Sequence, residues 1–561
     1  MASIIIREED NTSSVVSLDT YDIAYVPGFG DVSIANVSAF KPQLVATVEQ
    51  FRSLFGSTAP VYSESYYDGV TAPDGWDVTI NGDFEEFDAG NIEMGYLYAQ
   101  ELLQQGLPIY FERVNEAVEE TKAVSSSKIS FTLVQDTVNT YEATVTIPTF
   151  TKTWDSVQFN IIPTVELDDG VTYTSASYAS ISGSTTQCKV ILTGVVLPAD
   201  VSTVQGLVSL TKTGSSPITA AAMYAAMKQV VTGDTITKYS IFEKLKDRGT
   251  YSIKYVTTGG YPVLEFDDES VTRILLDVTG AVESSDAGEI TGRGEAIVLL
   301  DHTNNYNRPL IGTDSLFEYL NASADDSSSF RSKLQTTQQD YSKLLSFAAC
   351  FTPWCEYSLS KIEHAMPASF AYMKCLALST KTYGSQYAVS GVARGLVKDI
   401  TAVLTNDILT NNIANTYQKD PESGVGISIN AITMIQPYGY SIWGNRTMYN
   451  METSRGATAT SYLNLRSMVC TIKKIIYTAA RRYMFEQNSD ILWCNFRSMI
   501  TPELDRLQSG EGISKYTIIK GANSGKTKLY CNITIWPVYA VEKFDVTIQL
   551  EDEDASIVVG E

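Results

Sequence analysis

The sequence predicts an α/β (α+β) protein of several domains, with a mixed-sheet core, an inserted all-β domain, and extended N- and C-terminal arms. Three observations support this class. Helix-like and strand-like patterns alternate from residue 21 to 114 and return near 217. Residues 125–212 show strand patterns alone, and a β-type segment lies near each end. The 561 residues are enough to bury several cores.

The α/β regions are predicted from apolar spacing and from glycines at helix ends. Residues 45–56 and 94–106 have helical spacing and end at Gly56 and Gly106, and 108–114 follows as a strand. After the β-rich block, the same patterns predict helices at 218–231 and 366–381, strands at 249–260 and 294–304, and further apolar structure at 342–354.

The block from about 125 to 212 is rich in Thr, Ser and Val, and it shows no helical period. Its apolar residues alternate with polar ones, as at Ile129, Phe131 and Leu133. Alternation of this kind is typical of strands with one buried face. We therefore expect an inserted all-β domain, a sandwich that faces solvent.

The composition excludes several classes of protein. The net charge is −24, which repels nucleic acid unless a basic patch is segregated from the acidic residues. No apolar run approaches the roughly 18 residues of a membrane span, and the first residues lack the features of a signal peptide. We therefore expect a soluble protein, made in a cytoplasm, that binds no nucleic acid and does not insert into a membrane.

No group of residues has the spacing of a catalytic or metal site. The seven cysteines are scattered, without CxxC spacing, and are expected to be reduced and mostly buried thiols. His302 and His364 are the only histidines, too few for a histidine-based metal centre. We expect no enzyme, with no catalytic residue, no cofactor and no metal.

Five short segments resemble functional motifs without meeting their requirements. GANSGKT (521–527) has one residue too few for a phosphate-binding loop and lies between two strand patterns, so a hairpin turn is predicted. TGRGE (291–295) and TTGG (257–260) are predicted turns. Asp301 precedes His302 at the end of a predicted strand, and neighbouring strand residues point to opposite faces, so we expect a surface strand end. The run EDED (551–554) is predicted to be a solvated acidic tail.

The last third of the chain holds an amphipathic helix and a local excess of positive charge. Residues 462–485 have apolar side chains at helical spacing, and 488–507 predicts a second helix, with a possible break near Pro502. Between 440 and 520 the chain has eleven Arg or Lys against six Asp or Glu. From the pattern alone, this charge is either a solvated helix face or a docking surface for an acidic protein partner.

Several stretches resemble the tail sheath family of contractile phages and related injection systems. SIWGNRTMY (441–449) resembles the family segment WGARTL, and residues 462–493 resemble the helix that follows it in the family. KPQLVATVEQFRSLFG (41–56), LLQQGLPIYFERV (102–114) and GRGEAIVLLDH (292–302) match further segments, in family order over most of the chain. Residues 125–212 have no counterpart, and such sheaths often carry variable outer domains.

The resemblance implies a domain order. An N-terminal exchange arm (1–20) precedes an α/β sheath domain in two parts (21–120 and 216–345), separated by the inserted all-β outer domain (121–215). A C-terminal core domain that faces the tube (346–540) and a C-terminal exchange arm (541–561) follow.

The resemblance also implies partners and roles. Sheath subunits polymerise around a tail tube as a helix or stacked rings, and each lends two arms to neighbours by β-augmentation. The partners are then other copies of the chain, the tail tube protein, and baseplate and tail terminator proteins. The arm strands would be Ser3, Ile4, Ile5 and Ile6, and Phe544, Val546, Ile548 and Leu550. Candidate tube-facing cations are Arg466, Lys473, Lys474, Arg481, Arg482, Arg497 and Arg506. The core motif is Trp443, Gly444, Arg446, Thr447, Phe485, Asn488 and Trp493, with Trp443 buried and Arg446 paired with a carboxylate or carbonyl.

The function implied is a structural subunit of a contractile phage tail, located in the virion tail after assembly in the host cytoplasm. Its contraction, by subunit repacking, would drive the tube through the host envelope for genome ejection. One alternative is the sheath of a non-phage contractile injection system. Another is an adhesin or glycan-binding accessory protein in which the block 125–212 binds a glycan.

Overall fold

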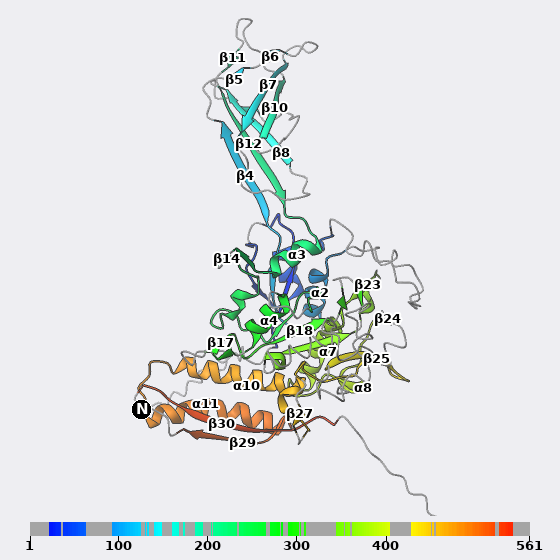
Figure 1. Ribbon diagram of the computed structural model, residues 1–561, viewed down its shortest axis with the longest axis vertical. Coiled ribbons are helices and arrows are strands. Elements are labelled where there is room, and N and C mark those ends of the chain that lie inside the picture. Colours follow the sequence, from blue (N-terminus) through cyan, green and yellow to red (C-terminus); the bar gives the residue numbers. More distant parts are fainter. Residues whose placement is uncertain are drawn as a thin grey trace, which may run out of the picture.

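The structure is a computed structural model of the chain (Figure 1). It describes residues 22–62, 92–124, 206–264, 270–283, 290–301, 344–403 and 428–541, except for the short gaps 35–36, 233–234, 281, 353, 360–361, 450–451, 454–455 and 522–526. Between 125 and 205, and between 302 and 309, it describes only the strands given below. The predicted arm strands and the acidic tail lie outside the described residues.

An eight-stranded mixed sheet forms the centre of the protein, as predicted. Six central strands are parallel, and β2 and β26 run antiparallel at the two edges. The order across the sheet is β2 (Gln43–Val45), β3 (Ile109–Arg113), β1 (Ala24–Gly28), β15 (Tyr255–Val256), β18 (Ile297–Asp301), β21 (Ala348–Thr352), β25 (Ile429–Ile435) and β26 (Gly439–Ile442).

The central strands have short, almost continuously apolar sequences. Every residue of β1, β18 and β21 is buried. Burial on both faces is what a parallel sheet covered by helices requires. The helices of this α/β part are α1 (Val48–Phe55), α2 (Met94–Gln104), α3 (Ala220–Met227), α4 (Val271–Thr279), α7 (Ala368–Thr382) and α8 (Gly391–Arg394), with short 3-10 turns at Glu243–Lys246 and Leu344–Phe347.

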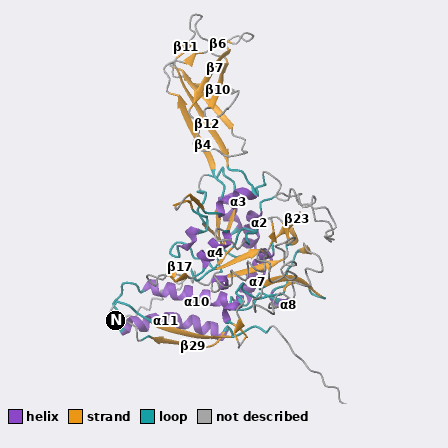
Figure 2. Cartoon of the chain, viewed as in Figure 1, coloured by secondary structure: helices purple, strands orange, loops and turns teal. Residues whose placement is uncertain are grey.

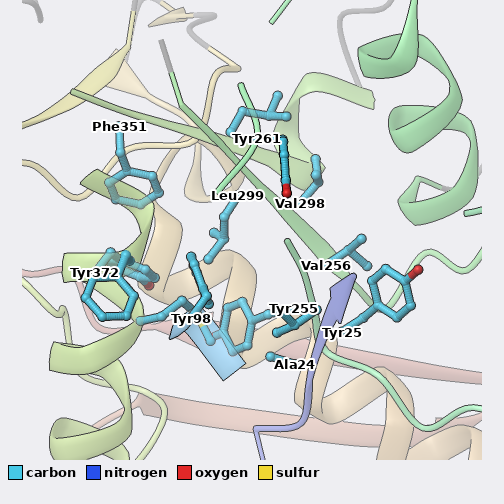
Figure 3. Packing of buried hydrophobic residues seen from close by; sticks show 14 of the residues in the cluster. Ala24, Tyr25, Tyr98, Tyr255, Val256, Tyr261, Val298, Leu299, Phe351 and Tyr372 are labelled. Atoms are coloured by element: carbon cyan, nitrogen blue, oxygen red, sulfur yellow. The ribbon is translucent and has the colours of Figure 1, made fainter. Parts of the chain in front are cut away.

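Aromatic rings dominate the core around this sheet (Figure 3). Phe111 of β3 lies between Phe51 and Phe55 of α1, with ring centres 4.9 and 4.6 Å away. Tyr25 of β1 and Tyr255 of β15 are fully buried on neighbouring strands. We call the eight-stranded sheet, its helices and this apolar core the body.

The β-rich block contains antiparallel strands only, within the part that the structure describes. They form a sheet of β4, β12, β8 and β9, a sheet of β10, β7 and β6, and the pair β11 and β5. Ser216 N donates to Glu116 O at 3.1 Å, so the chain leaves the body and returns at the same place. Figure 1 shows these strands beyond α3, away from the central sheet. Their bounds are β4 Ala117–Val124, β5 Ile129–Ser130, β6 Thr132–Leu133, β7 Thr140–Ile147, β8 Asn160–Leu167, β9 Thr172–Tyr173, β10 Thr186–Thr193, β11 Thr203–Val204 and β12 Gly206–Ser215.

Short strand pairs lie between the larger elements. Those early in the chain are β13 (Val230–Thr232) with β14 (Thr235–Lys238), β16 (Val282–Glu283) with β17 (Ile290–Thr291), and β19 (Thr303–Asn304) with β20 (Arg308–Pro309). Later, β22 (Cys355–Leu359) pairs with both β23 (Ile362–Met366) and β24 (Ile400–Val403), and β27 (Glu452–Thr453) pairs with β28 (Gly456–Ala457).

The C-terminal part forms a separate layer below the body (Figure 2), which we call the C-terminal layer. It comprises α10 (Leu463–Arg482), α11 (Asp490–Ser509), β29 (Ile513–Lys520) and β30 (Cys531–Pro537). The predicted strands on either side of 521–527 do form a hairpin, in which β29 pairs antiparallel with β30. The expected break at Pro502 is wrong, because α11 continues through this residue to Ser509.

The glycine-rich segments are turns, as predicted. Gly259, Gly260, Gly292 and Gly294 all have positive φ. A Cβ on Gly259 or on Gly292 would lie 2.3 Å from a backbone oxygen, so both positions require glycine. Of the cysteines that the structure describes, four are buried and none forms a disulfide. No helix in the described ranges is long and apolar enough to cross a membrane.

Candidate assembly surface

The C-terminal layer has its own apolar core. Leu465 and Met468 of α10 pack with Phe496 and Ile500 of α11. Strand β29 contributes Ile513 and Ile518 to the same core. We call the antiparallel pair of β29 and β30 the ribbon. Two helices on one side and two strands on the other give this core only two walls. Two helices therefore form the thick wall of this core, and the two-stranded ribbon forms the thin wall.

Local sequence signals explain where its helices begin and end. The Ser489 side chain accepts from Leu492 N at 3.2 Å and begins α11, and Gly510 ends it. In the turn before α11, Phe485 has φ of +68° and a fully exposed side chain. A bulky residue seldom adopts this backbone conformation, and an exposed phenylalanine gains nothing from burial. The turn therefore presents an apolar tip.

The ribbon of β29 and β30 is only half covered. Along β30, partly buried residues alternate with exposed ones, and Trp536 is 41% exposed. Among the described residues, each strand of the ribbon pairs with the other alone, so each has one unpaired edge. Unpaired strand edges present backbone donors and acceptors to any further strand.

A groove runs between α11 and the ribbon. It is lined by Arg497, Thr501 and Gln508 from α11 and by the four consecutive residues 516–519 of β29. Consecutive strand residues point to opposite faces, so a groove that touches four in a row follows the edge of β29. An extended segment could lie there against both a strand edge and a helix.

The opposite face of α10 contacts the body through polar groups. Lys473 Nζ donates to Gly294 O at 2.9 Å, and the Ser467 and Tyr255 hydroxyls are 2.8 Å apart. Arg466 donates to the Ser346 hydroxyl, and its guanidinium carbon lies 4.2 Å from the centre of the Phe347 ring. Helix α10 thus packs an apolar face against α11. It meets the body through these polar groups together with Leu463 and Cys470, which belong to the core of the body.

These contacts correct part of the predicted tube-facing set. Arg466 and Lys474 are buried between α10 and the body, so neither is placed to meet a tube. Burial lowers the pKa of Arg466, and burial followed by repulsion from Arg293 lowers the pKa of Lys474 to about 8. Lys473 is exposed, but its Nζ donates to Gly294 O. The other exposed cations of the set are Arg481, Arg482, Arg497 and Arg506.

The segment WGNRT is a corner, but the prediction that Trp443 is buried is wrong. This side chain is 44% exposed, although its backbone N donates to Ala431 O at 2.7 Å. Gly444 and Thr447 are buried, and Thr447 Oγ1 donates to Thr460 O at 2.9 Å. The guanidinium carbon of Arg446 lies 4.2 Å from the centre of the Tyr462 ring.

The other motif residues do not form one core with this corner. Phe485 and Asn488 are exposed in the turn between α10 and α11, and Trp493 is half-buried with its ring 6.3 Å from that of Phe496. Thr447 N donates to Ser461 O, just before α10 begins. The motif therefore joins the body to the C-terminal layer at Arg446 and Thr447, while its later residues lie at the far end of α10.

Two buried carboxylates were not recognised as such from the sequence. Asp301 was expected at a surface, but it is buried at the end of β18 and accepts from Ser369 N at 2.8 Å and from the Ser369 hydroxyl at 2.6 Å. Glu93 begins α2, where its oxygens accept from Phe29 N, Gly95 N, Tyr96 N and the Tyr261 hydroxyl. Burial outweighs these donors and raises the pKa of each carboxyl to about 7.

Each of these carboxylates accepts from backbone N–H groups in the first turn of a helix and fixes that helix to the sheet. Glu93 holds the first turn of α2 against β1, and Asp301 holds the first turn of α7 against β18. Neither is grouped with metal-type ligands, and no cluster of three His, Cys, Asp or Glu that could hold a metal is found in the described residues. The polar carboxyl edge of the sheet is thus occupied by structural hydrogen bonds.

No protein-family model and no curated protein matches the sequence. Solved structures do match. The contracted helical sheath of the anti-feeding prophage is 13% identical, covering 98% of this chain and 99% of that chain with a TM-score of 0.43. The sheath tail protein from Listeria innocua is 10% identical, covering 92% and 95% with a TM-score of 0.41. The sheath tail protein from Desulfitobacterium hafniense is 9% identical, covering 98% and 100% with a TM-score of 0.39.

The chain is thus similar, over nearly its full length, to tail sheath proteins, the class that its sequence motifs resemble.

Proposed function

We propose that this chain is a structural, non-enzymatic subunit of a contractile tail sheath. The observation that carries the proposal is the half-covered ribbon of β29 and β30, with two unpaired edges in the described part of the chain. The chain also has two β-type segments outside the described residues, at 3–6 and 544–550. Two such segments from neighbouring copies would supply one strand to each edge.

Strand exchange between copies would explain why one wall of the C-terminal layer has only two strands within a single chain. A two-stranded ribbon is only marginally stable alone, and further strands would extend the wall over the core of the layer. Backbone pairing between copies would link each subunit to its neighbours. The links could persist while the compact bodies repack, which is how we propose that the sheath contracts without a nucleotide.

The exposed cations of the C-terminal layer are candidates for the contact with the tube. Arg481, Arg482, Arg497 and Arg506 lie on α10 and α11 and are exposed. Arg506 Nε donates to Glu503 Oε2 at 3.0 Å, and Arg481 Nη1 donates to Gly249 O at 3.4 Å. Arg482 and Arg497 are therefore the stronger candidates. Exposed charge pairs are weak and screened by salt, so they could break during contraction.

We further propose that the assembly is a phage tail, formed in the host cytoplasm and present in the virion, where contraction ejects the genome through the host envelope. The large inserted β-rich block favours this origin over a non-phage injection machine, since an outer decoration suits a particle exposed to solvent. Baseplate and tail terminator proteins would then bind the two ends of the sheath. Mass spectrometry of purified particles tests this: a capsid protein beside the chain supports a phage, and its absence supports an injection machine.

Arm exchange is tested by a proline placed in the predicted C-terminal strand. Val546→Pro removes a backbone donor and should prevent pairing at a ribbon edge. Electron microscopy at moderate salt, with the tube protein co-expressed to nucleate assembly, should show tubes or stacked rings for the parent chain and none for Val546→Pro. Ser556→Pro, beyond the strand, is the matched control and should assemble. Normal polymers from Val546→Pro, and from chains lacking residues 1–12 or 543–561, would falsify arm exchange.

A further inference from the structure

A tyrosine–arginine cluster lies on the segment that follows α7, from Tyr383 at the end of that helix through a loop to Arg394, the last residue of α8. The guanidinium carbon of Arg394 is 5.2 Å from the centre of the Tyr387 ring and 5.8 Å from that of Tyr383. The two rings are 6.2 Å apart, with their planes at 68°. Arg394 Nε donates to Ala388 O at 2.8 Å, which fixes the plane of the guanidinium. We call Tyr383, Tyr387 and Arg394 the clamp.

The clamp has the chemistry of a carboxylate site. Its two terminal guanidinium nitrogens have no acceptor among the residues that the structure describes. Arg394 is half-buried and Tyr383 is 51% exposed, so an incoming group can reach them. A planar guanidinium held in place presents paired N–H donors that match the two oxygens of a carboxylate. The flanking rings add cation–π stabilisation and restrict access of water.

Trp443 is exposed beside the same loop. Ser390 Oγ donates to Ile442 O at 3.0 Å and accepts from Gly444 N at 3.2 Å, so the backbone on both sides of Trp443 is bonded to the loop that carries the clamp. Tryptophan, tyrosine and arginine are the residues most enriched where protein interfaces gain their affinity. The surface therefore fits a protein partner that carries carboxylates.

The loop is also fixed to one end of the ribbon. Gln386 Nε2 donates to Gly510 O at 3.1 Å, directly before β29. A Cβ on Gly512 would lie 2.9 Å from that of Gln386, which shows how closely the two segments pack. Val538 N, directly after β30, donates to Gly512 O at 3.1 Å. The clamp loop thus adjoins the end where β29 begins and β30 finishes.

We propose that the clamp binds carboxylates of the acidic segment 551–554 from a second copy of this chain. This inference rests on the proposed arm exchange. If the strand 544–550 of a neighbour pairs along the ribbon and ends near Ile513, residues 551–554 extend at most about 14 Å beyond it. They then reach the clamp loop. The four residues EDED supply the carboxylates, and the clamp is a cationic site on a chain whose net charge is −24.

Fluorescence anisotropy with a labelled peptide tests the clamp. The peptide spans residues 542–561, and the receptor is the full chain kept below the concentration at which it assembles. Arg394→Gln should weaken binding at least about tenfold, since it removes a charge-assisted bidentate contact. Arg394→Lys should lose most of that affinity as well, because it keeps the charge and lacks the planar fork. Arg52→Gln removes an exposed arginine of α1 and should leave binding unchanged.

Two changes in the peptide separate the clamp from the arm strand. In the first peptide, Gln or Asn replaces the acidic residues 551–554. It should bind to the parent chain as weakly as the acidic peptide binds to Arg394→Gln. Combining the altered peptide with Arg394→Gln should cause no further loss of affinity. Full binding to Arg394→Gln, or no binding of the peptide to the parent chain, overturns the clamp. A peptide with Val546→Pro reports on the arm strand alone. If it binds normally, arm exchange fails; if it fails to bind while Arg394→Gln has no effect, only the clamp fails.

Discussion

The body and the C-terminal layer bury their residues to different degrees. In the body, every residue of β1, β18 and β21 is buried, and aromatic rings fill the space under the helices. In the C-terminal layer, β30 is only half covered, and large apolar side chains are exposed at Phe485, Ile491, Ile519 and Trp536. The difference teaches that the central strands of the body are covered on both faces within one chain. The layer instead leaves two strand edges and one face, among the described residues, that further strands can cover.

The contact between the body and the C-terminal layer contains more polar groups than the core of either region. Many of its groups on α10 are polar: Arg466, Ser467 and Lys473 bond to the body, and Lys474 is buried there. Leu463 and Cys470 add apolar contacts with the core of the body. Apolar contact alone would favour any close packing, whereas hydrogen bonds to specific oxygens favour a single orientation. The polar contact therefore fixes how the assembly surface is presented relative to the body.

The largest effect is expected in the body. Phe111→Ala leaves a cavity between Phe51 and Phe55 and should cost about 3–5 kcal/mol of the free energy of unfolding. Hydrogen exchange followed by mass spectrometry reports on each region separately. Body amides should exchange much faster, while those of α11 and β29 change little. Equal acceleration in both regions would show that they unfold as one unit, which breaks the comparison.

A gain in stability is expected where the two regions meet. Lys474 is buried and has no hydrogen bond or ion pair with the residues that the structure describes, and burial lowers its pKa to about 8. At pH 7 the folded protein must keep this charge out of water. Lys474→Met should therefore raise the free energy of unfolding by up to about 3 kcal/mol. The matched control, Lys473→Met, should give no gain, since it loses the bond to Gly294 O. A loss of stability for Lys474→Met would contradict this account.

The body should also respond to pH. The pKa of Glu93 is raised to about 7 by burial, so folding takes up a proton at pH values between the ordinary 4.5 and about 7. The contribution to stability is full below pH 4.5, falls by up to about 1.4 kcal/mol per pH unit as the pH rises, and is lost above pH 7. Asp301 adds a similar dependence, beginning from its ordinary pKa of 3.8.

Urea unfolding at several pH values measures this slope. Glu93→Gln cannot ionise, so it should reduce the slope between pH 4.5 and 7 even though the amide also disturbs the hydrogen bonds at this helix end. Adding Asp301→Asn should reduce the slope further. An unchanged slope in the double variant would assign the pH dependence to other groups.

The smallest effect is expected at the apolar tip. Phe485→Ala removes a fully exposed ring and keeps the same strained backbone, so the free energy of unfolding should change by less than about 0.5 kcal/mol. Thermal unfolding of the purified chain checks this, with Phe111→Ala as the buried counterpart. A destabilisation as large as that of Phe111→Ala would show that the tip is covered in solution.

Much of the fold followed from local pattern. The helices at 45–56, 94–106 and 366–381 and the hairpin around 521–527 are present with nearly the predicted bounds, because apolar period and cap residues act over a few neighbouring positions. The parallel strand β1 and the hairpin of β25 and β26 were not predicted. Their position in the sheet depends on pairing with strands far away in the sequence, and local patterns carry no information on such pairing.

The candidate site was predicted less well than the fold. Arg466 and Lys474 fall on the polar side of a helical pattern, which predicts exposure when a helix has one buried face. Helix α10 instead lies between α11 and the body, so both of its faces are covered. The clamp was not found at all, because Tyr383, Tyr387 and Arg394 give no recognisable spacing, and their contact depends on the turn before α8.

By itself, the sequence determined the α/β class, the helices, the β-rich block and the absence of catalytic spacing, because each depends on composition or on contacts a few residues apart. Only the tertiary structure decided which of these residues face solvent. It buried Asp301, Arg466 and Lys474 and left Trp443 and Phe485 exposed. The physical reason is that periodicity fixes the face on which a side chain lies, while the neighbour that covers this face comes from a distant part of the chain.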